Sequence, residues 1–496
     1  MAEHFSGPQS CDDGALMTVR FRDLVPESHP VRYIDRFIDG IDIKQFESRY
    51  RVGSGLKGRA PKDIRLMLKV VLYAIYCRIY SARKIDYATA NYADFWFFTH
   101  GERISHDKIS DFIVMHGDDI HPVFLETIGL ANRNELLDFS ALYEDGFKIK
   151  ANASIKRSYK LAGLNKQEQK LSENLAGVLT KLQQSEEDET AKEEREKTKH
   201  ALSTIASLRE ELQKRIAQRS IGKPPSKAEP IAQNTRINMT DPDAEVMKQK
   251  DNSHAVSYLK ETAVDPKADI VVGSVVSGHD DEIQLSLPLT EKVNCNCQDA
   301  GCTKAYDTVV TDSRFTSVAN CAAFEEKKLI LIGPTQAHEH QRREPTPDGI
   351  SFRYNESDTT VRCSEGQTLQ CQRAFHSGVE NADIKVFNNP EACAQCTRRK
   401  DCTTSKEGYR TVKLDTRYPA QQRALDRYLS EGGQALYKKR SHSGETYQGD
   451  LKQNGRFLRF LRRGIERVKV DSRLHDIVWN LRRIINAKGA AIVWST

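Results

Sequence analysis

The chain has 496 residues, of which 38% are hydrophobic and 29% charged, a composition typical of soluble globular proteins. Its 75 Lys and Arg side chains outnumber its 69 Asp and Glu side chains by too little to indicate a nucleic-acid partner from net charge alone. The start lacks a signal-peptide pattern and the most apolar run, residues 64–79, is shorter than the roughly 20 residues that cross a bilayer, so we expect a cytoplasmic protein with no membrane partner.

The first part of the chain is predicted to be helical. After a flexible leader, residues 1–15, a helical N-terminal domain is expected over residues 16–130, because apolar residues recur at helical spacing between Ile64 and Ile79. Residues 104–120 fit a turn followed by a helix, as in helix-turn-helix domains that bind DNA. The residues leave open whether this domain binds DNA or serves packing or dimerisation.

A strand pattern with Asp145 inside it follows from about residue 137. Residues 165–219 then carry two helical stripes of Leu and Ile on either side of a densely charged stretch, which predicts a helical hairpin or coiled coil. Residues 221–234 contain three prolines and predict a linker. We therefore expect an inserted hairpin over residues 155–235.

The next segments alternate between strand and helix patterns. Strands are predicted at 257–265, 269–278, 305–312 and 329–334, with a helix at 317–328. This order predicts an α/β fold with a mixed sheet. Residues 335–420 are polar and rich in cysteine and are expected to be a second insertion, before helices at 419–440 and 450–488.

The cysteines are unevenly spread, since nine of eleven lie between Cys295 and Cys402. In a reducing cytosol such clustering favours metal binding over disulfides. One group is a lone cysteine followed by C-x2-C-x5-C, and four thiolates can hold Zn²⁺ tetrahedrally. The candidate Zn²⁺ ligands are Cys363, Cys393, Cys396 and Cys402. A second group, at residues 295–302, is interpreted as part of a loop.

Two aspartates stand where strands could bring them together. Asp145 lies within an apolar strand, where a carboxylate is costly unless it has a partner or a metal. Asp312 ends another strand, and for it a helix cap is an equal alternative. Mg²⁺ prefers hard oxygen ligands, and pairs of Mg²⁺ ions about 3.5–4 Å apart act in many nucleases and polymerases. Such carboxylates indicate phosphodiester chemistry.

Three segments together resemble the DDE transposases of bacterial insertion sequences, with similarity from about residue 16 to residue 488. They are YEDGFKIKANAS, VVTDSRFTSVANCAAFEE and LYKKRSHSGETYQGDLKQNGRFLRFLRRG. The resemblance implies an RNase H-like catalytic domain over residues 136–488, interrupted by the two insertions. It makes Asp145, Asp312 and Glu445 the catalytic residues and the ligands of Mg²⁺, with Mn²⁺ as an alternative. Phe147, Gly444 and Gln448 depart from the usual family pattern.

A basic stretch follows Glu445, between Lys452 and Lys469. It predicts a helix that neutralises phosphates, and the alternative is an amphipathic helix with a solvated basic face. Lys452 is the best candidate to touch a phosphate near the carboxylates. The residues assigned to DNA contacts are Lys148, Lys150, Arg440, Lys452, Arg456, Arg459, Arg462 and Arg463.

The function that the resemblance implies is metal-dependent cleavage at insertion-sequence ends, followed by strand transfer into target DNA. The expected partners are the double-stranded terminal repeats and target DNA, bound by a homodimer associated with the bacterial nucleoid. Three alternatives stay open. They are an inactive DNA-binding relic or repressor, a nuclease of the same fold without strand transfer, and a structural coiled-coil protein with a zinc module.

Overall fold

The computed structural model describes residues 20–49, 62–184, 189–221, 223–280, 283–336, 351–378 and 382–494. The predicted leader, residues 1–15, lies outside these ranges. The chain divides into two compact units, one of Met1–Asp119 with Lys488–Thr496 and the other of Ile120–Ala487. Within the described ranges, no helix is both long and apolar enough to span a bilayer.

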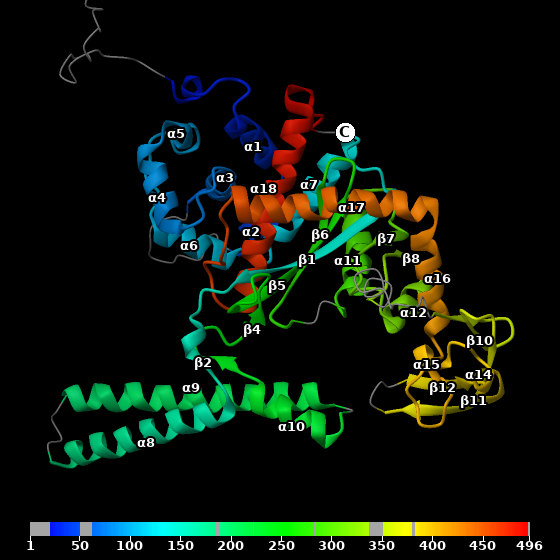
Figure 1. The fold of residues 1–496 in the computed structure, drawn as a ribbon. Helices are drawn as coiled ribbons and strands as arrows, with labels where there is room; N and C mark the ends of the chain where they lie inside the picture. Colours follow the sequence, from blue (N-terminus) through cyan, green and yellow to red (C-terminus); the bar gives the residue numbers. More distant parts are fainter. Residues whose placement is uncertain are drawn as a thin grey trace, which may run out of the picture. The chain divides into compact units, whose positions relative to one another are not determined.

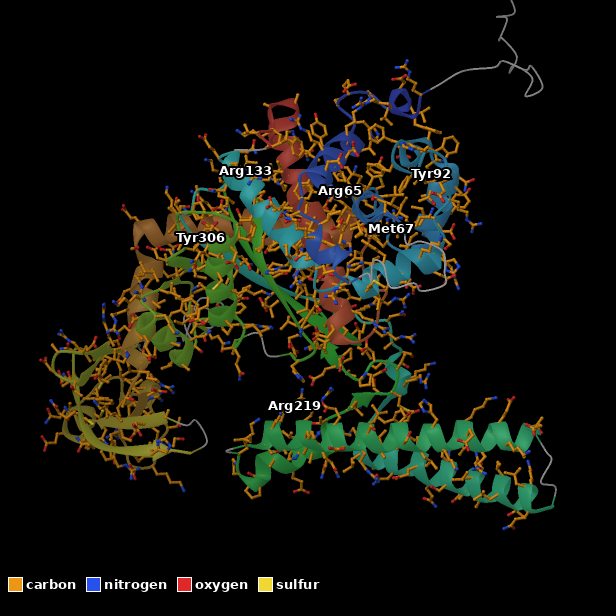
Figure 2. All side chains as sticks on the ribbon, turned by 180° about the vertical axis from the view of Figure 1, so that it is seen from behind. Arg65, Met67, Tyr92, Arg133, Arg219 and Tyr306 are labelled. Atoms are coloured by element: carbon orange, nitrogen blue, oxygen red, sulfur yellow. The ribbon has the colours of Figure 1, made fainter. Side chains whose placement is uncertain are left out.

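The first unit is built from helices, as predicted. Its central helix α3 (Ile64–Tyr76) begins after Asp63, whose side chain accepts a hydrogen bond of 2.7 Å from Leu66 N, and it buries Met67 in the interior (Figure 2). The predicted turn and helix near residue 104 are confirmed by α6. The other helices are η1 (Phe21–Leu24), α1 (Pro30–Asp39), α2 (Lys44–Glu47), α4 (Ala82–Asn91), α5 (Ala93–Thr99) and α6 (His106–Met115).

The second unit contains the predicted mixed sheet (Figure 1). Its order is β4-β5-β1-β7-β8, and β6 pairs with β5. Strand β1 pairs antiparallel with β5 and parallel with β7, so the two halves of the sheet meet at β1. The strands are β1 (Leu142–Lys150), β4 (Glu245–Lys248), β5 (His254–Asp265), β6 (Ile270–Ser277), β7 (Thr308–Val310) and β8 (Ile330–Ile332).

Helices cover both faces of this sheet. On one face, α11 (Ser286–Asp299) packs on β5 and β6, and α7 (Ile120–Arg133) contacts α11 and β6. The first unit therefore ends at Asp119 rather than at the expected residue 130, because α7 belongs to the core of the second unit. On the other face lie α16 (Tyr418–Leu429) and α17 (Glu431–Gly449), where Tyr143 packs against Tyr428 in one apolar cluster. Helix α12 (Val318–Glu326) joins β7 to β8.

Helix α11 was not predicted, and it corrects the interpretation of the cysteines near residue 295. Cys295 and Cys297 lie within α11, and only Cys302 lies in the loop that follows. The sequence between Ser286 and Asp299 has few apolar residues, because only one side of the helix faces the sheet. Cys297 is buried on that side.

Within the segment predicted as a hairpin lie α8 (Leu161–Gln184) and α9 (Glu189–Ser220), which run side by side (Figure 1). Its core is a cluster that includes Leu164, Ile205 and Leu208. The predicted linker is wrong, since Pro225–Asn234 form helix α10, which has Pro225 in its first turn, where proline is tolerated, and Pro230 in its interior. Near the end of α9, Arg219 forms an ion pair with Glu245 of β4 (Figure 2).

The cysteine-rich insertion forms a second sheet that the sequence did not predict. Its strands pair antiparallel in the order β13-β12-β11-β10-β9. Strand β11 is exposed at most positions, so its sequence lacks the apolar alternation that marks a half-buried strand. The strands are β9 (Phe352–Asn355), β10 (Thr360–Cys363), β11 (Thr368–Ser377), β12 (Ala382–Asn388) and β13 (Val412–Asp415).

The predicted basic helix is wrong over much of its length. Helix α17 continues through Glu445 and is followed by a π-helical turn, η3 (Asp450–Asn454), and an irregular stretch before α18 (Ile465–Lys488). Gly464 has φ +82°, a conformation that ends the irregular stretch and that other residues rarely adopt. Buried Phe460 donates a hydrogen bond of 2.9 Å from its N–H to Lys150 O, which holds the stretch against the end of β1.

Candidate active site

Strand register brings Asp145 and Asp312 to the same face of the sheet. Tyr143 of β1 pairs with Val310 of the parallel strand β7, and both are buried in the cluster under α16 and α17. Each aspartate lies two residues further along its chain than this pair. Because successive side chains of a strand point to opposite faces, Asp145 faces α17 as Tyr143 does.

Helix α17 places Glu445 next to this pair. A Cβ atom added to Gly444 would lie 3.5 Å from Cβ of Asp145, so the helix backbone passes close to the strand at the residue before Glu445. Burial raises the pKa of Asp145 to about 6; Arg440 opposes the rise, Asp312 adds to it, Lys250 opposes it, and Glu445 adds to it. Carboxylates from two other elements, Asp312 and Glu445, therefore act electrostatically on Asp145.

Two side chains of α17 hold the Asp145 carboxylate. Arg440 donates from Nη2 to Oδ1 at 2.9 Å, and Gln448 donates from Nε2 to Oδ2. Both the Arg440 and the Asp145 side chains are 13% exposed. The sequence assigned Arg440 to DNA and assigned no role to Gln448, whereas the structure brings both to Asp145.

The alternative interpretation of Asp312, as the cap of the next helix, is wrong. Its Oδ1 accepts a hydrogen bond of 2.8 Å from Arg314 N in the turn after β7. Ser317 caps α12 instead, since its side chain accepts from Asn320 N at 3.2 Å. Asp312 is thus held in a turn beside Asp145 and is partly exposed.

Two lysines stand around the carboxylates in addition to Arg440. Lys452 of η3 lies with Nζ 5.0 Å from the ring centroid of Phe147, and burial lowers its pKa, an effect that Lys250 strengthens and Asp145 opposes. Lys250 lies exposed in the turn between β4 and β5. The sequence singled out Lys452 and missed Lys250, because nothing in the local sequence shows that this turn reaches the carboxylates.

Lys148 and Lys150 lie on the opposite side of β1 from Asp145, since they alternate with it along the strand. Lys148 Nζ forms an ion pair of 2.7 Å with Asp280 and is 17% exposed. On that face Gly146 lies against Glu261, whose Oε1 is only 2.1 Å from where a Cβ would be. The structure therefore does not bring these two lysines to the carboxylates, and Gly146 makes room for a buried glutamate.

The four arginines of the irregular stretch differ in their surroundings. Arg456 and Arg459 are exposed, Arg463 donates from Nε to Asn152 O at 2.9 Å, and Arg462 forms an ion pair with Asp471. Burial raises the pKa of Asp471, and Arg462 opposes that rise. Arg462 is thus engaged within the fold, while Arg456 and Arg459 are presented to solvent.

A buried network anchors α17 to the sheet and to α18. Lys260 of β5 and Asp476 of α18 are each 1% exposed, and Lys260 Nζ lies 2.6 Å from Asp476 Oδ1. Tyr447 OH donates to the same Oδ1 at 2.5 Å and accepts from Lys260 Nζ at 2.9 Å. Because Tyr447 follows Glu445 by two residues, this network fixes the part of α17 that carries the glutamate.

The donor chemistry of the three carboxylates fits a divalent cation that takes oxygen ligands. Burial raises the pKa of Asp145, and Asp312 and Glu445 add to the rise, so a cation among the three carboxylates would relieve the repulsion between their like charges. In the described part of the chain, no three or more His, Cys, Asp or Glu side chains are already grouped as a metal site. Arg440 and Gln448 occupy the Asp145 oxygens instead.

The predicted Zn²⁺ ligands lie in the cysteine-rich insertion that contains the second sheet. Cys363 ends β10, Cys393 lies in α14 (Pro390–Ala394), Cys396 follows it in a turn, and Cys402 ends α15 (Arg399–Cys402). All four are free cysteines and line one pocket. The structure thus brings these four residues together, far along the chain from the carboxylates.

Comparison with protein families gave two matches. Residues 362–485 match the family model described as Transposase DDE domain, and residues 19–114 match the model described as Transposase domain (DUF772). The first match includes Glu445, Arg440 and Lys452 and begins after Asp145 and Asp312. The two matches support a DDE transposase of an insertion element. Neither the curated proteins nor the solved structures gave a match.

Proposed function

We propose that the protein is a DNA transposase that cleaves the ends of an insertion sequence and joins them to target DNA. The observation that carries this proposal is the convergence of Asp145, Asp312 and Glu445 from β1, the end of β7 and α17. The mixed sheet, whose antiparallel and parallel halves meet at the strand of Asp145, supports an RNase H-like core. The two transposase family matches support the same activity.

In this proposal Asp145, Asp312 and Glu445 hold two Mg²⁺ ions, or Mn²⁺ in their place. Bound there, the ions supply stabilisation of the attacking and leaving oxygens of an in-line displacement at phosphorus. The raised pKa of Asp145, caused first by burial, supports this assignment, because a cation beside the carboxylate would favour its charged form. Arg440, which forms an ion pair with Asp145, offsets the negative charge of that carboxylate and holds it in position.

The proposed reaction has two displacements. In the first, water attacks the phosphodiester at the element end, a new P–O bond forms, and the bond to the 3′ oxygen breaks, which leaves a 3′-hydroxyl. In the second, this hydroxyl attacks a target phosphodiester, forms a new P–O bond and releases a 3′-hydroxyl of the target. Lys452 and Lys250, which already act on the Asp145 region, would neutralise phosphate charge there.

Arg440 has a second property that suits a DNA substrate. Its buried Nε has no hydrogen-bond partner among the described residues, while Nη2 is engaged by Asp145. A phosphate oxygen can accept from a guanidinium that also binds a carboxylate, since the fork carries five donors. We therefore assign Arg440 both to the positioning of Asp145 and to a phosphate contact.

The first unit offers a face for DNA on α4. Arg83, Lys84, Tyr87 and Asn91 are exposed along this helix, and Tyr87 stacks edge-on with Tyr92, which lies on the surface (Figure 2). The helix of the predicted turn-helix stretch is α6. Its exposed Asp107 and Asp111 would repel phosphates, so α6 is less suited to DNA than α4. We propose that α4 contacts DNA, so Arg83→Gln with Lys84→Gln should weaken binding while Asp107→Asn should not.

The test of the proposed function is cleavage and joining of labelled element-end DNA with Mg²⁺ or Mn²⁺. Asp145→Asn, Asp312→Asn and Glu445→Gln should bind the DNA but neither cut nor join it. Glu431→Gln, a change to an exposed acid on the same helix as Glu445, is the matched control and should cut like wild type. If wild type binds the DNA but never cuts it, the interpretation as an inactive DNA-binding relic would hold instead. If it cuts the DNA but does not join it, the interpretation as a nuclease of the same fold would hold.

A further inference from the structure

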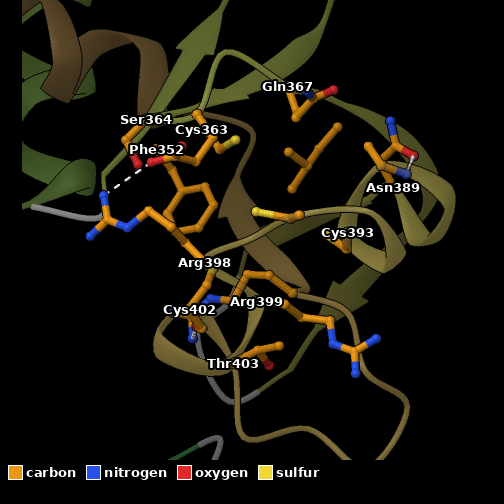
Figure 3. A pocket seen from close by; sticks show the side chains of 15 residues that line it. Phe352, Cys363, Ser364, Gln367, Asn389, Cys393, Arg398, Arg399, Cys402 and Thr403 are labelled. Atoms are coloured by element: carbon orange, nitrogen blue, oxygen red, sulfur yellow. Dashed lines mark hydrogen bonds and ion pairs between the residues drawn. The ribbon is translucent and has the colours of Figure 1, made fainter. Parts of the chain in front are cut away.

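Four cysteines outside the carboxylate site surround one pocket of the second sheet. Figure 3 shows Cys363, Cys393 and Cys402 around this pocket, and Cys396 also lines it. They come from three places in the chain, namely the end of β10, the α14 region and the end of α15. None of the transposition chemistry proposed above uses them.

The backbone holds these cysteines on tight turns. Cys396 N donates to Cys393 O at 3.2 Å, and Arg399 N donates to Cys396 O at 3.2 Å, so the C-x2-C step forms a compact turn. Cys363 O accepts from Gly366 N at 2.9 Å, and Gly366 has φ +77°, which closes a second turn. Tight turns of this kind can present thiolates from separate short segments to one metal ion.

The charges around the pocket suit thiolates. Cys363, Cys393, Cys396 and Cys402 all line this one pocket. Arg398, Arg399 and Arg410 also line the pocket. Four thiolates on one Zn²⁺ leave a net charge of about −2, which these guanidinium groups would compensate.

The small sheet has little apolar core to hold it together. Its apolar cluster has three buried residues, Val361, Leu369 and Phe387, with only partly buried side chains packed against them, and β11 is exposed along most of its length. Small lobes with thin cores are commonly stabilised by a metal or by disulfides. All four cysteines are free, so a disulfide does not supply that link here.

We propose that Cys363, Cys393, Cys396 and Cys402 bind one structural Zn²⁺ that ties the α14–α15 segment to the β10–β11 turn. The described thiols line the pocket without being grouped as a ready-made metal site, so binding draws them inward from turns that already face it. Zinc binding of this kind stabilises the folded lobe, because the unfolded chain has no preformed site. The ion has no part in phosphodiester chemistry.

The test is the metal content of the full chain purified without added chelator. We expect about one zinc per chain by mass spectrometry in wild type. Serine substitutions at positions 363, 393, 396 and 402 should each lower that content severalfold. Cys371→Ser is the matched control, since Cys371 is an exposed cysteine of β11 that does not line the pocket, and it should keep the zinc.

Two further measurements keep the outcome clear. If a serine variant fails to fold, titration of wild type with a mercurial thiol reagent should release the zinc as the thiols react, with a metal-sensitive dye as the readout. Asp145→Asn should retain the zinc, which separates this site from the proposed catalytic one. Wild type without zinc, iron with an absorbance band in its place, or zinc retained in all four serine variants would overturn the proposal.

Discussion

Gln448 donates a hydrogen bond from Nε2 to Oδ2 of Asp145, across the gap between α17 and β1. The two side chains are buried or nearly so, and Gln448 follows Glu445 by three residues, on the same side of the helix. Gln448, which orients the Asp145 carboxylate, is therefore carried by α17, the same helix that carries Glu445. Any shift of α17 would move both at once.

Gln448→Met should reduce cleavage while leaving DNA binding intact. The substitution keeps the length of the side chain and removes the donor to Asp145, and a hydrogen bond to a charged group contributes about 1.5–3 kcal/mol. We expect the cleavage rate to fall roughly 10- to 100-fold. Gln453→Met, at an exposed position of η3, is the control and should cut normally. An unchanged rate for Gln448→Met would show that Asp145 needs no such support.

The raised pKa of Asp145 predicts how stability changes with pH in metal-free protein. The folded-state pKa of about 6 lies above the ordinary value of 3.8, so the folded chain holds this proton more tightly and loses stability as pH rises from about 4 to 6. The Asp145→Asn variant should not lose stability in this way, because asparagine does not titrate. Above pH 7 it should be more stable than wild type by up to about 3 kcal/mol, and the difference should vanish below pH 4. Urea denaturation across this pH range in chelator measures it.

Divalent cations should reverse that difference. Mg²⁺ or Mn²⁺ that binds Asp145, Asp312 and Glu445 stabilises the folded chain by mass action, by about 2.7 kcal/mol when the cation is at 100 times its Kd. We expect the Tm of wild type to rise with Mn²⁺ at pH 8 and that of Asp312→Asn to stay unchanged. Equal shifts in both proteins would mean that the cation binds elsewhere.

The buried Lys260–Asp476 pair predicts a stability effect that reaches the site. Lys260→Met leaves Asp476 and Tyr447 without their cation, and breaking a buried pair costs about 3–5 kcal/mol. The double change Lys260→Met with Asp476→Asn should recover part of that loss, because no uncompensated charge remains. Urea midpoints compare the two. A double variant no more stable than the single one would mean that packing, rather than charge, accounts for the loss.

Basic side chains that are exposed to solvent can bind DNA, whereas those that form ion pairs within the fold are not free to do so. Arg459→Gln should weaken DNA binding and lower the slope of log K against log salt by about 0.9, as expected for one lost phosphate contact. Lys148→Gln should leave the slope unchanged, since Lys148 pairs with Asp280 on the other face of β1. Equal slopes for the two variants would contradict this assignment. Salt titrations of a labelled duplex measure both.

Much of the architecture follows from local patterns. The apolar runs at 257–265 and 269–278 predict β5 and β6, and the two apolar stripes predict the α8–α9 hairpin, because periods of two and 3.6 residues report which side of an element is buried. Asp145 stood out for the same reason, as a carboxylate in an apolar strand. Where a segment is mostly exposed, as in β11, or buries polar residues such as Thr290 and Asn296, as in α11, the apolar period is weak and the prediction failed.

The sequence by itself thus determined the main strands of the sheet, the hairpin and the choice of Asp145 and Asp312, all of which depend on residues near one another in the chain. Only the tertiary structure decided that Gln448 and Lys250 act on Asp145, that Lys148 lies on the far face, and that the basic stretch after η3 is not a helix. These features depend on the register of β1 with β7, on the close approach of α17 at Gly444 and on the docking of Phe460, which join residues more than a hundred positions apart. A local pattern carries no information about such contacts.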